Sequence, residues 1–171
     1  MAMDPTLTAL VEYTDWDRAK WQDWLGRQDA KVLDLAAGPH GDGRFERVGD
    51  LIKHIFGAEQ RYVERLLDRP LTDTAALPHD DLAALFRFGQ QSRQELRQLL
   101  ATFPAEAWDV PREFKILTHS VTASPKKIVI HVLMHEIRHW AQIATLLRVN
   151  GLKVEFHDFL FSPATGAASA R

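Results

Sequence analysis

Cysteine is absent from this chain of 171 residues. Without cysteine the chain can form no disulfide bond, no zinc site built on thiolates and no thiol nucleophile of its own. The absence also fits a protein that works in a reducing compartment. Any chemistry that needs a thiol would therefore have to take it from a small molecule.

The chain also lacks a strong net charge and a long apolar run. Its formal net charge is −2, so no basic field indicates a nucleic-acid partner. No apolar stretch approaches the roughly 18 residues that cross a bilayer. The first residues, Met1 to Pro5, lack the charged segment and apolar run of a secretory signal. We therefore expect a soluble, cytoplasmic protein without a nucleic-acid or membrane partner.

Helical periodicity is what the sequence does contain, in four segments. Hydrophobic residues make up 46% of the chain, which is enough to fill the core of one domain. Apolar residues recur at steps of three and four in the ranges Leu7–Arg27, Val48–Leu67, Asp80–Phe103 and Pro125–Val149. Pro70 and Pro78 bracket the linker between the second and third ranges.

The connections and ends of the chain complete the predicted architecture. Trp108–Ala123, rich in β-branched residues and proline, indicates either an irregular crossover or a short extended piece. We expect an all-α, up-down four-helix bundle with this long crossover before the last helix. Residues 1–162 would form the single domain, and the small residues of 163–171 predict a flexible tail.

Three histidines lie at four-residue intervals in the last helical segment, namely His131, His135 and His139. Residues four apart on a helix lie one turn apart and about 40° from the same face, so two such imidazoles can hold one metal ion. His131 falls about 100° off the line predicted to face the core, which makes it a poor candidate ligand. That line runs through Ile128, Val132, His135, His139, Gln142 and Leu146.

His54, in the second helical segment, is the candidate third ligand. It follows Leu51 by three residues and precedes Ala58 by four, so it shares the buried face of that helix. A bundle can bring this face against the histidine pair of the last helix. Three neutral imidazoles with open coordination positions would suit Zn²⁺, Ni²⁺ or a similar divalent ion. Hydrogen-bonded positions in the core would explain the same histidines without a metal.

His135, Glu136 and His139 also form the His-Glu-x-x-His string typical of zinc metallohydrolases. With or without proteolysis, Glu136 is the candidate catalytic residue, as a general base towards a metal-bound water or thiol; the alternative is a solvent-facing charge. A protease needs a distal third ligand, and Glu155 is the candidate carboxylate. The last helix ends near Gly151, which leaves little chain for a second ligand-bearing helix.

Three blocks of the chain together resemble the DinB-like superfamily of bacterial four-helix-bundle proteins. The blocks are Glu12–Trp16, Val48–Glu59 and His131–Gln142. By position, the resemblance implies that His54, His135 and His139 are the metal ligands and that His131 is not. The chain departs from the family at Glu136 and at Trp140–Ala141, where an Arg-Gly pair is frequent.

The activity that the resemblance implies uses a low-molecular-weight thiol in some relatives. A divalent ion stabilises a thiolate, which is the reactive form of a thiol. We therefore expect a metal-dependent, thiol-cofactor S-transferase that acts on small electrophilic molecules, and a homodimer as in relatives. The alternatives are a non-enzymatic metal- or ligand-binding stress protein and, with less support, a zinc metallohydrolase.

Thr14, Gly89 and Ser92 are small members of otherwise bulky stripes in the first and third helical segments. Ordinary alternation of large and small side chains explains such positions. The functional interpretation is a cofactor pocket over the open metal positions, with Ser92 or Thr14 available to a ligand. The sequence leaves both interpretations open.

Overall fold

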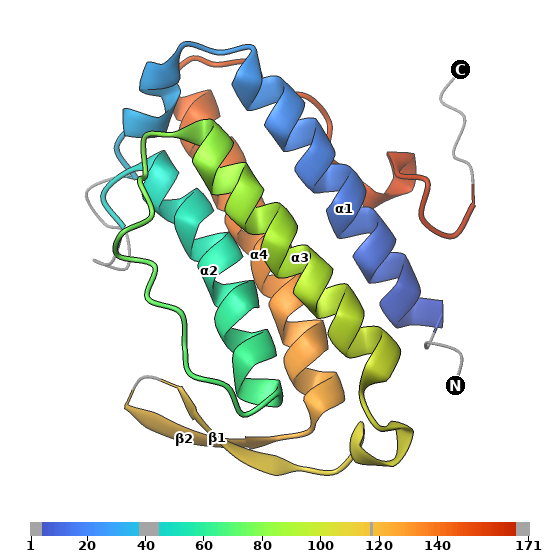
Figure 1. Ribbon diagram of the computed structural model, residues 1–171. Helices are drawn as coiled ribbons and strands as arrows, with labels where there is room; N and C mark the ends of the chain where they lie inside the picture. Colours follow the sequence, from blue (N-terminus) through green and yellow to red (C-terminus); the bar gives the residue numbers. More distant parts are fainter. Residues whose placement is uncertain (1–4, 38–44, 117, 167–171) are drawn as a thin grey trace.

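The computed structural model describes residues 5–37, 45–116 and 118–166 and contains four long helices, shown in Figure 1. These are α1 (Pro5–Gly26), α2 (Val48–Leu66), α3 (Leu82–Thr102) and α4 (Pro125–Val149). Short 3-10 helices lie in the connections: η1 (Ala30–Asp34), η2 (Ala105–Ala107) and η3 (Phe159–Phe161). Each long helix begins and ends within two residues of its predicted range.

Side-chain caps fix where two of these helices begin. Before α3, the carboxylate of Asp81 accepts a hydrogen bond from the Ala84 amide at 2.9 Å. Before α4, the Ser124 hydroxyl accepts one from the Lys127 amide at 3.3 Å, and Pro125 takes the first helical position. Caps of this kind satisfy amides that have no partner within the helix. Because they are local, the sequence alone predicts these boundaries well.

The direction of α3 corrects the predicted up-down order. Residues 67–81 run back along the length of α2, so α2 and α3 point the same way (Figure 1). The prediction placed the long crossover before the last helix instead. A helix of 19 residues is about 28 Å long, and the 15 residues of this connection can span more than that when extended. The linker that contains Pro70 and Pro78 is therefore the connection that crosses the length of the bundle.

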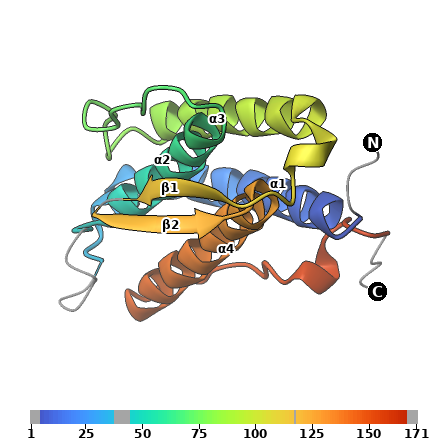
Figure 2. The same cartoon turned by 90° about the horizontal axis from the view of Figure 1, so that it is seen from below.

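A β-hairpin joins α3 to α4, as Figure 2 shows from below. Strand β1 (Arg112–Ile116) pairs antiparallel with β2 (His119–Ala123), with Phe114 opposite Val121 and Arg112 opposite Ala123. Phe114 and Ala123 are buried and join the core. The extended interpretation of this segment is thus correct, and the strictly all-α prediction is wrong by one hairpin.

The core consists of two apolar clusters with a layer of buried charge between them. One cluster contains Trp21 and Trp140, and the other contains Leu99 and Leu133. Midway along each helix, between the positions that form the two clusters, a buried charged residue contributes to this layer. These four residues, the charged layer, are Arg18 of α1, Glu59 of α2, Arg93 of α3 and Glu136 of α4.

The segment after α4 folds back against α1. The Tyr13 hydroxyl donates to the backbone oxygen of His157 at 2.6 Å, and the His157 ring contacts the Asp17 carboxylate at 2.5 Å. Ser162 and Ala164 are buried, whereas residues 167–171 of the predicted tail lie outside the described residues. None of the helices in the described ranges has the length and hydropathy of a membrane-spanning segment.

Candidate metal centre

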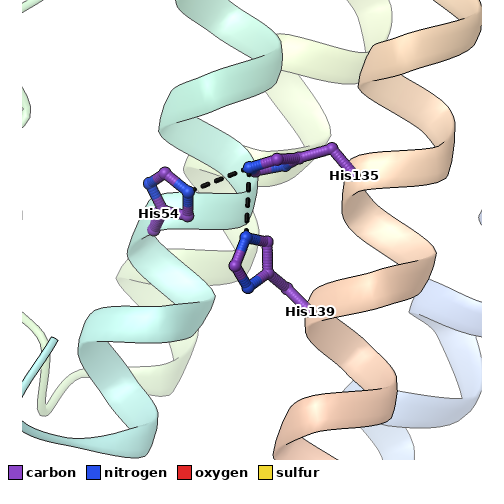
Figure 3. Close-up of side chains that lie close together, drawn as sticks. All are labelled: His54, His135 and His139. Atoms are coloured by element: carbon purple, nitrogen blue, oxygen red, sulfur yellow. Dashed lines mark hydrogen bonds between the residues drawn. The ribbon is translucent and has the colours of Figure 1, made fainter. Parts of the chain in front are cut away.

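Three imidazoles converge at the interface of α2 and α4 (Figure 3). Nε2 of His135 lies 2.9 Å from Nε2 of His54 and 3.1 Å from Nε2 of His139. One potential ligand atom of each residue lies within 4.8 Å of the others. His135 and His139 lie on adjacent turns of α4, and His54 faces them from α2. The structure thus brings together the three histidines that the sequence selected.

The spacing of the three nitrogens fits a shared cation. A ring nitrogen carries either one proton or one lone pair, so Nε2 of His135 can make a good hydrogen bond to only one of its two neighbours. A cation accepts all three lone pairs at once. Nitrogens bound at about 2.1 Å to one tetrahedral zinc ion lie roughly 3.4 Å apart. The observed distances are close to that value, so small adjustments complete the site.

The protonation of the cluster also suits a metal. Burial, together with the neighbouring rings of His139 and His54, lowers the pKa of His135 to about 3. The ring is therefore neutral at physiological pH, which is the form that binds metal. Nδ1 of His139 lies 3.0 Å from the amide oxygen of Gln142. A proton on Nδ1 donates to this oxygen and leaves the lone pair of Nε2 for the ion.

Phe45 packs against the histidine cluster, whereas His131 lies outside the cluster. The ring of Phe45 packs 4.4 Å from that of His54, centroid to centroid, and 6.1 Å from that of His139. His131 is exposed, and its Nε2 lies 3.4 Å from the hydroxyl of Tyr62. It is not a member of the group that could hold an ion.

The core-facing line of α4 lies about one residue later than predicted. The buried line runs through Val129, Leu133, Glu136, Trp140, Ile143 and Leu147. Gln142 and Leu146, which belonged to the predicted line, are only half-buried. The charged Glu136 interrupts the apolar pattern of this buried line, and for that reason the sequence pattern favoured the neighbouring line. His135 and His139 consequently lie on the flank of the core, where α4 meets α2.

Glu136 does not belong to the histidine cluster. Its carboxylate accepts hydrogen bonds from Arg18 at 2.8 Å, Arg93 at 2.7 Å and the indole of Trp140 at 3.1 Å. The residue is 2% exposed. The side chain predicted either as a catalytic base or as a solvent-facing charge is therefore a buried anion held by two guanidinium groups.

The charged layer balances two guanidinium groups against two carboxylates. Glu59 lies 3.0 Å from Arg18 and 3.0 Å from Arg93, so each cation contacts both anions. Burial alone would lower the pKa of Arg18, but Glu136 and Glu59 raise it above its ordinary value. Arg18 was not among the predicted site residues. The sequence does contain a signal for it, because Arg18 stands where helical spacing places a core residue. The line is Val11, Thr14, Arg18, Trp21 and Leu25.

The predicted pocket residues support this layer instead of facing the histidines. The Ser92 hydroxyl donates to Glu59 at 2.7 Å, and the Thr14 hydroxyl accepts from Arg93 at 2.8 Å. A Cβ atom on Gly89 would lie 2.8 Å from the ring of Phe56, so glycine permits close helix packing there. None of Thr14, Gly89 and Ser92 lines the cavity beside His54 and His135.

The distal carboxylate of the protease interpretation is also elsewhere. Glu155 is exposed and pairs with Arg27 at 2.7 Å. The histidine pair of α4 is completed by His54 and not by Glu155. Glu136 is buried in the charged layer. The site therefore lacks two features of a protease of this class, the glutamate base and the distal carboxylate ligand.

One side of the cluster is open. A cavity of about 620 Å³ is lined by His54 and His135, so a small molecule can approach these two ligands. No curated protein matches the sequence. A sequence profile of the DinB family matches residues 3–167. Because this match covers nearly the whole chain, as the three sequence blocks led us to expect, the chain belongs to the DinB family.

Proposed function

We propose that this chain is a metal-dependent enzyme that joins a low-molecular-weight thiol to small electrophilic molecules. The observation that carries the proposal is the convergence of His54, His135 and His139 beside an open cavity. The absence of cysteine adds support, because the nucleophilic sulfur has to arrive with a small molecule.

The roles of the residues follow from their contacts. His54, His135 and His139 would hold the ion, and Zn²⁺ or Ni²⁺ suits three imidazoles. The ion would supply the positive charge that keeps a thiol deprotonated near neutral pH. Gln142 orients the ring of His139. In the transfer, a bond forms between sulfur and the electrophilic carbon while the leaving group departs with its bonding electrons, and the thiol proton goes to solvent.

The experiment combines metal analysis with a thiol panel. The chain is loaded with Zn²⁺ or Ni²⁺, and its metal content is compared with that of His54→Ala and of the matched control His131→Ala. Each protein is then incubated with an alkyl halide and with several cellular thiols, and thioether formation is followed by mass spectrometry. We expect metal-dependent acceleration with at least one thiol in the wild type and in His131→Ala, but not in His54→Ala.

Other outcomes point to the remaining functions. A loaded protein that accelerates no thiol would instead be a metal- or ligand-binding protein without enzymatic activity. If Glu155→Ala lost the metal while His54→Ala kept it, the ligand set itself would be wrong and the metallohydrolase interpretation would gain. Hydrolysis of an ester or peptide by the loaded chain would favour the metallohydrolase as well.

The proposal includes a homodimer and a Zn²⁺ or Ni²⁺ ion, and both can be tested by measurements in solution. The chain has a mass of 19.5 kDa, so a dimer would show twice that value in light scattering. Elemental analysis of protein purified without added metal identifies the ion that the site selects.

A further inference from the structure

The cavity beside the histidine cluster has cationic walls. His54 and His135 line one part of its surface, and Arg61, Arg65 and Lys115 line another. The histidines come from α2 and α4, the arginines from α2 and the lysine from β1. A molecule that enters this space and reaches the histidines therefore lies close to three positively charged side chains.

The spacing along α2 sets the distance between the cluster and the cations. His54, Ala58, Arg61 and Arg65 follow one another at steps of four, three and four, so they share one stripe of the helix. Seven residues separate His54 from Arg61, which corresponds to two turns or about 10.5 Å along the axis. The cations thus lie towards the end of α2 that faces the hairpin.

The hairpin is fastened to this end of α2 by Arg65. Its Nε donates to the backbone oxygen of Lys115 at 3.0 Å, and its Nη1 donates to that of Arg61 at 3.2 Å. These bonds place β1 beside α2, so that Lys115 and Arg61 line the same cavity. Arg65 is accordingly a positioning residue, and the other two cations are available to a ligand.

The three cations of this wall differ from the arginines of the charged layer in their ion pairing. In the parts of the chain that the structure describes, no carboxylate forms an ion pair with Arg61, Arg65 or Lys115. Burial lowers the pKa of Arg65 below its ordinary value, Tyr62 and Glu64 oppose this shift, and the charge of Arg61 adds to it. The two arginines of the charged layer, by contrast, contact carboxylates: Arg18 contacts two, and Arg93 contacts three. Unpaired guanidinium groups in a cavity are suited to bind a carboxylate or phosphate.

We infer that the small molecule bound in this cavity carries an anionic group, a carboxylate or a phosphate, about 10 Å from the atom that reaches the histidines. Arg61 and Lys115 hold the anionic group between α2 and β1. The inference rests on the proposed function, because it takes the histidine cluster as the second anchor of the ligand. Charge then selects among the thiols or electrophiles that fit the cavity.

The test uses two thiols with the same six-carbon chain, 6-mercaptohexanoate, which ends in a carboxylate, and 6-mercaptohexanol, which ends in a neutral alcohol. Both are titrated into the full chain loaded with Co²⁺, which replaces the colourless Zn²⁺ so that the sulfur-to-cobalt absorption band reports binding. We expect the carboxylate thiol to bind about tenfold or more tightly than the alcohol, since its charge pairs with the cations of the cavity wall. The phosphate analogue, 6-mercaptohexyl phosphate, shows which of the two anions the site prefers.

Two double variants separate local recognition from net charge. Arg61→Gln with Lys115→Gln should reduce the preference for the carboxylate thiol to less than about threefold and leave binding of the alcohol unchanged. The matched control, Lys31→Gln with Arg87→Gln, removes the same charge from exposed positions outside the cavity. It should retain the full preference.

A titration with probes that contain no sulfur, into the chain without metal, tests the anion site separately from the thiol chemistry. Hexanoate and hexanol are added to the metal-free chain and followed by amide chemical shifts in NMR. Equal affinity for charged and neutral probes in both the loaded and the metal-free chain would overturn the inference. If neither thiol gives a sulfur band but hexanoate still binds better than hexanol, and the double variant abolishes this difference, the thiol chemistry fails and the anion site stands.

Discussion

Glu136 illustrates how partners from other helices decide the chemistry of a residue. In the sequence it is the glutamate of a His-Glu-x-x-His string. In the fold its carboxylate accepts hydrogen bonds from Arg18 and Arg93. A general base has to face the reacting group, whereas Glu136 points into the core and the histidines lie on its flank.

The charged layer makes a prediction for Glu136→Gln. The substitution keeps the size of the side chain but removes a buried carboxylate that both Arg18 and Arg93 contact. Removing one partner of a buried ion pair typically costs about 3–5 kcal/mol in the free energy of unfolding. For a chain of this length, that corresponds to a fall in Tm of roughly 6–20 °C. Thermal unfolding followed by circular dichroism measures the change.

The control for this prediction is Glu12→Gln, at an exposed position of α1. It should change the free energy of unfolding by less than about 0.5 kcal/mol. The metal content of folded Glu136→Gln should equal that of the wild type. A Glu136→Gln variant that is fully stable but has lost thiol transfer would restore the catalytic role that the sequence suggested.

At the scale of the elements, Gly49 controls how closely the start of α2 packs against the connection to α3. A Cβ atom at this position would clash with the backbone oxygen of His79, which cannot rotate away. We expect Gly49→Ala to lower the free energy of unfolding by at least about 1–3 kcal/mol, as overpacking does. Urea denaturation provides the measurement.

Gly26→Ala, at the end of α1, is the matched control for Gly49→Ala. A Cβ atom there meets nothing within 4 Å. The exchange should be neutral or should stabilise the chain by up to about 1 kcal/mol, because alanine restricts the unfolded chain. Equal effects of the two substitutions would mean that the connection gives way easily and does not hold α2 in place.

Glu64 fastens the same connection to the end of α2 and gives it a pH dependence. The carboxylate accepts hydrogen bonds from the Thr72 amide at 2.8 Å, from the Thr72 hydroxyl and from Gln60 at 3.0 Å. Burial alone would raise the pKa of Glu64, but these hydrogen bonds bring it below its ordinary value of about 4.5. Folding therefore favours the charged carboxylate.

The sign of the expected pH effect follows from this lowered pKa. The stability that Glu64 contributes is complete above the unfolded value, near pH 4.5, and is lost as the pH falls through the lower folded value. The wild type should thus be more stable than Glu64→Gln at about pH 6, and the difference should shrink by about pH 3. Urea denaturation of both proteins at the two pH values measures it, and a constant difference would contradict the assignment.

At the scale of the whole molecule, a metal at the histidine cluster would join α2 to α4. A ligand that binds only the folded chain stabilises it by about 2.7 kcal/mol when its free concentration is a hundredfold above Kd. For a domain of this size, that is a rise in Tm of roughly 5–11 °C. We expect this rise with Zn²⁺ in the wild type, measured by calorimetry with buffered metal.

The same measurement distinguishes the ligands from their neighbour. His131→Ala should show the full rise in Tm, because His131 lies outside the cluster. His54→Ala should show little or none, because only the two ligands of α4 remain. A rise in His54→Ala as large as in the wild type would mean that the ion binds elsewhere.

Features that depend on neighbours along the chain could be predicted from the amino-acid sequence. Periodicity and caps predicted the four helices to within two residues, and four-residue spacing selected His135 and His139. His54 was predictable because it shares a helix face with Leu51 and Ala58. The family likewise follows from sequence blocks alone.

Features that depend on partners far along the chain could be seen only in the folded protein. The return of residues 67–81 fixes the direction of α3, and no local pattern encodes it. The members of the charged layer lie on four different helices, so each looks like an isolated polar residue until the bundle closes. Lys115 joins Arg61 only through the hairpin. Burial and charge pairing are set by long-range packing, and for that reason the motif around Glu136 did not reveal its role.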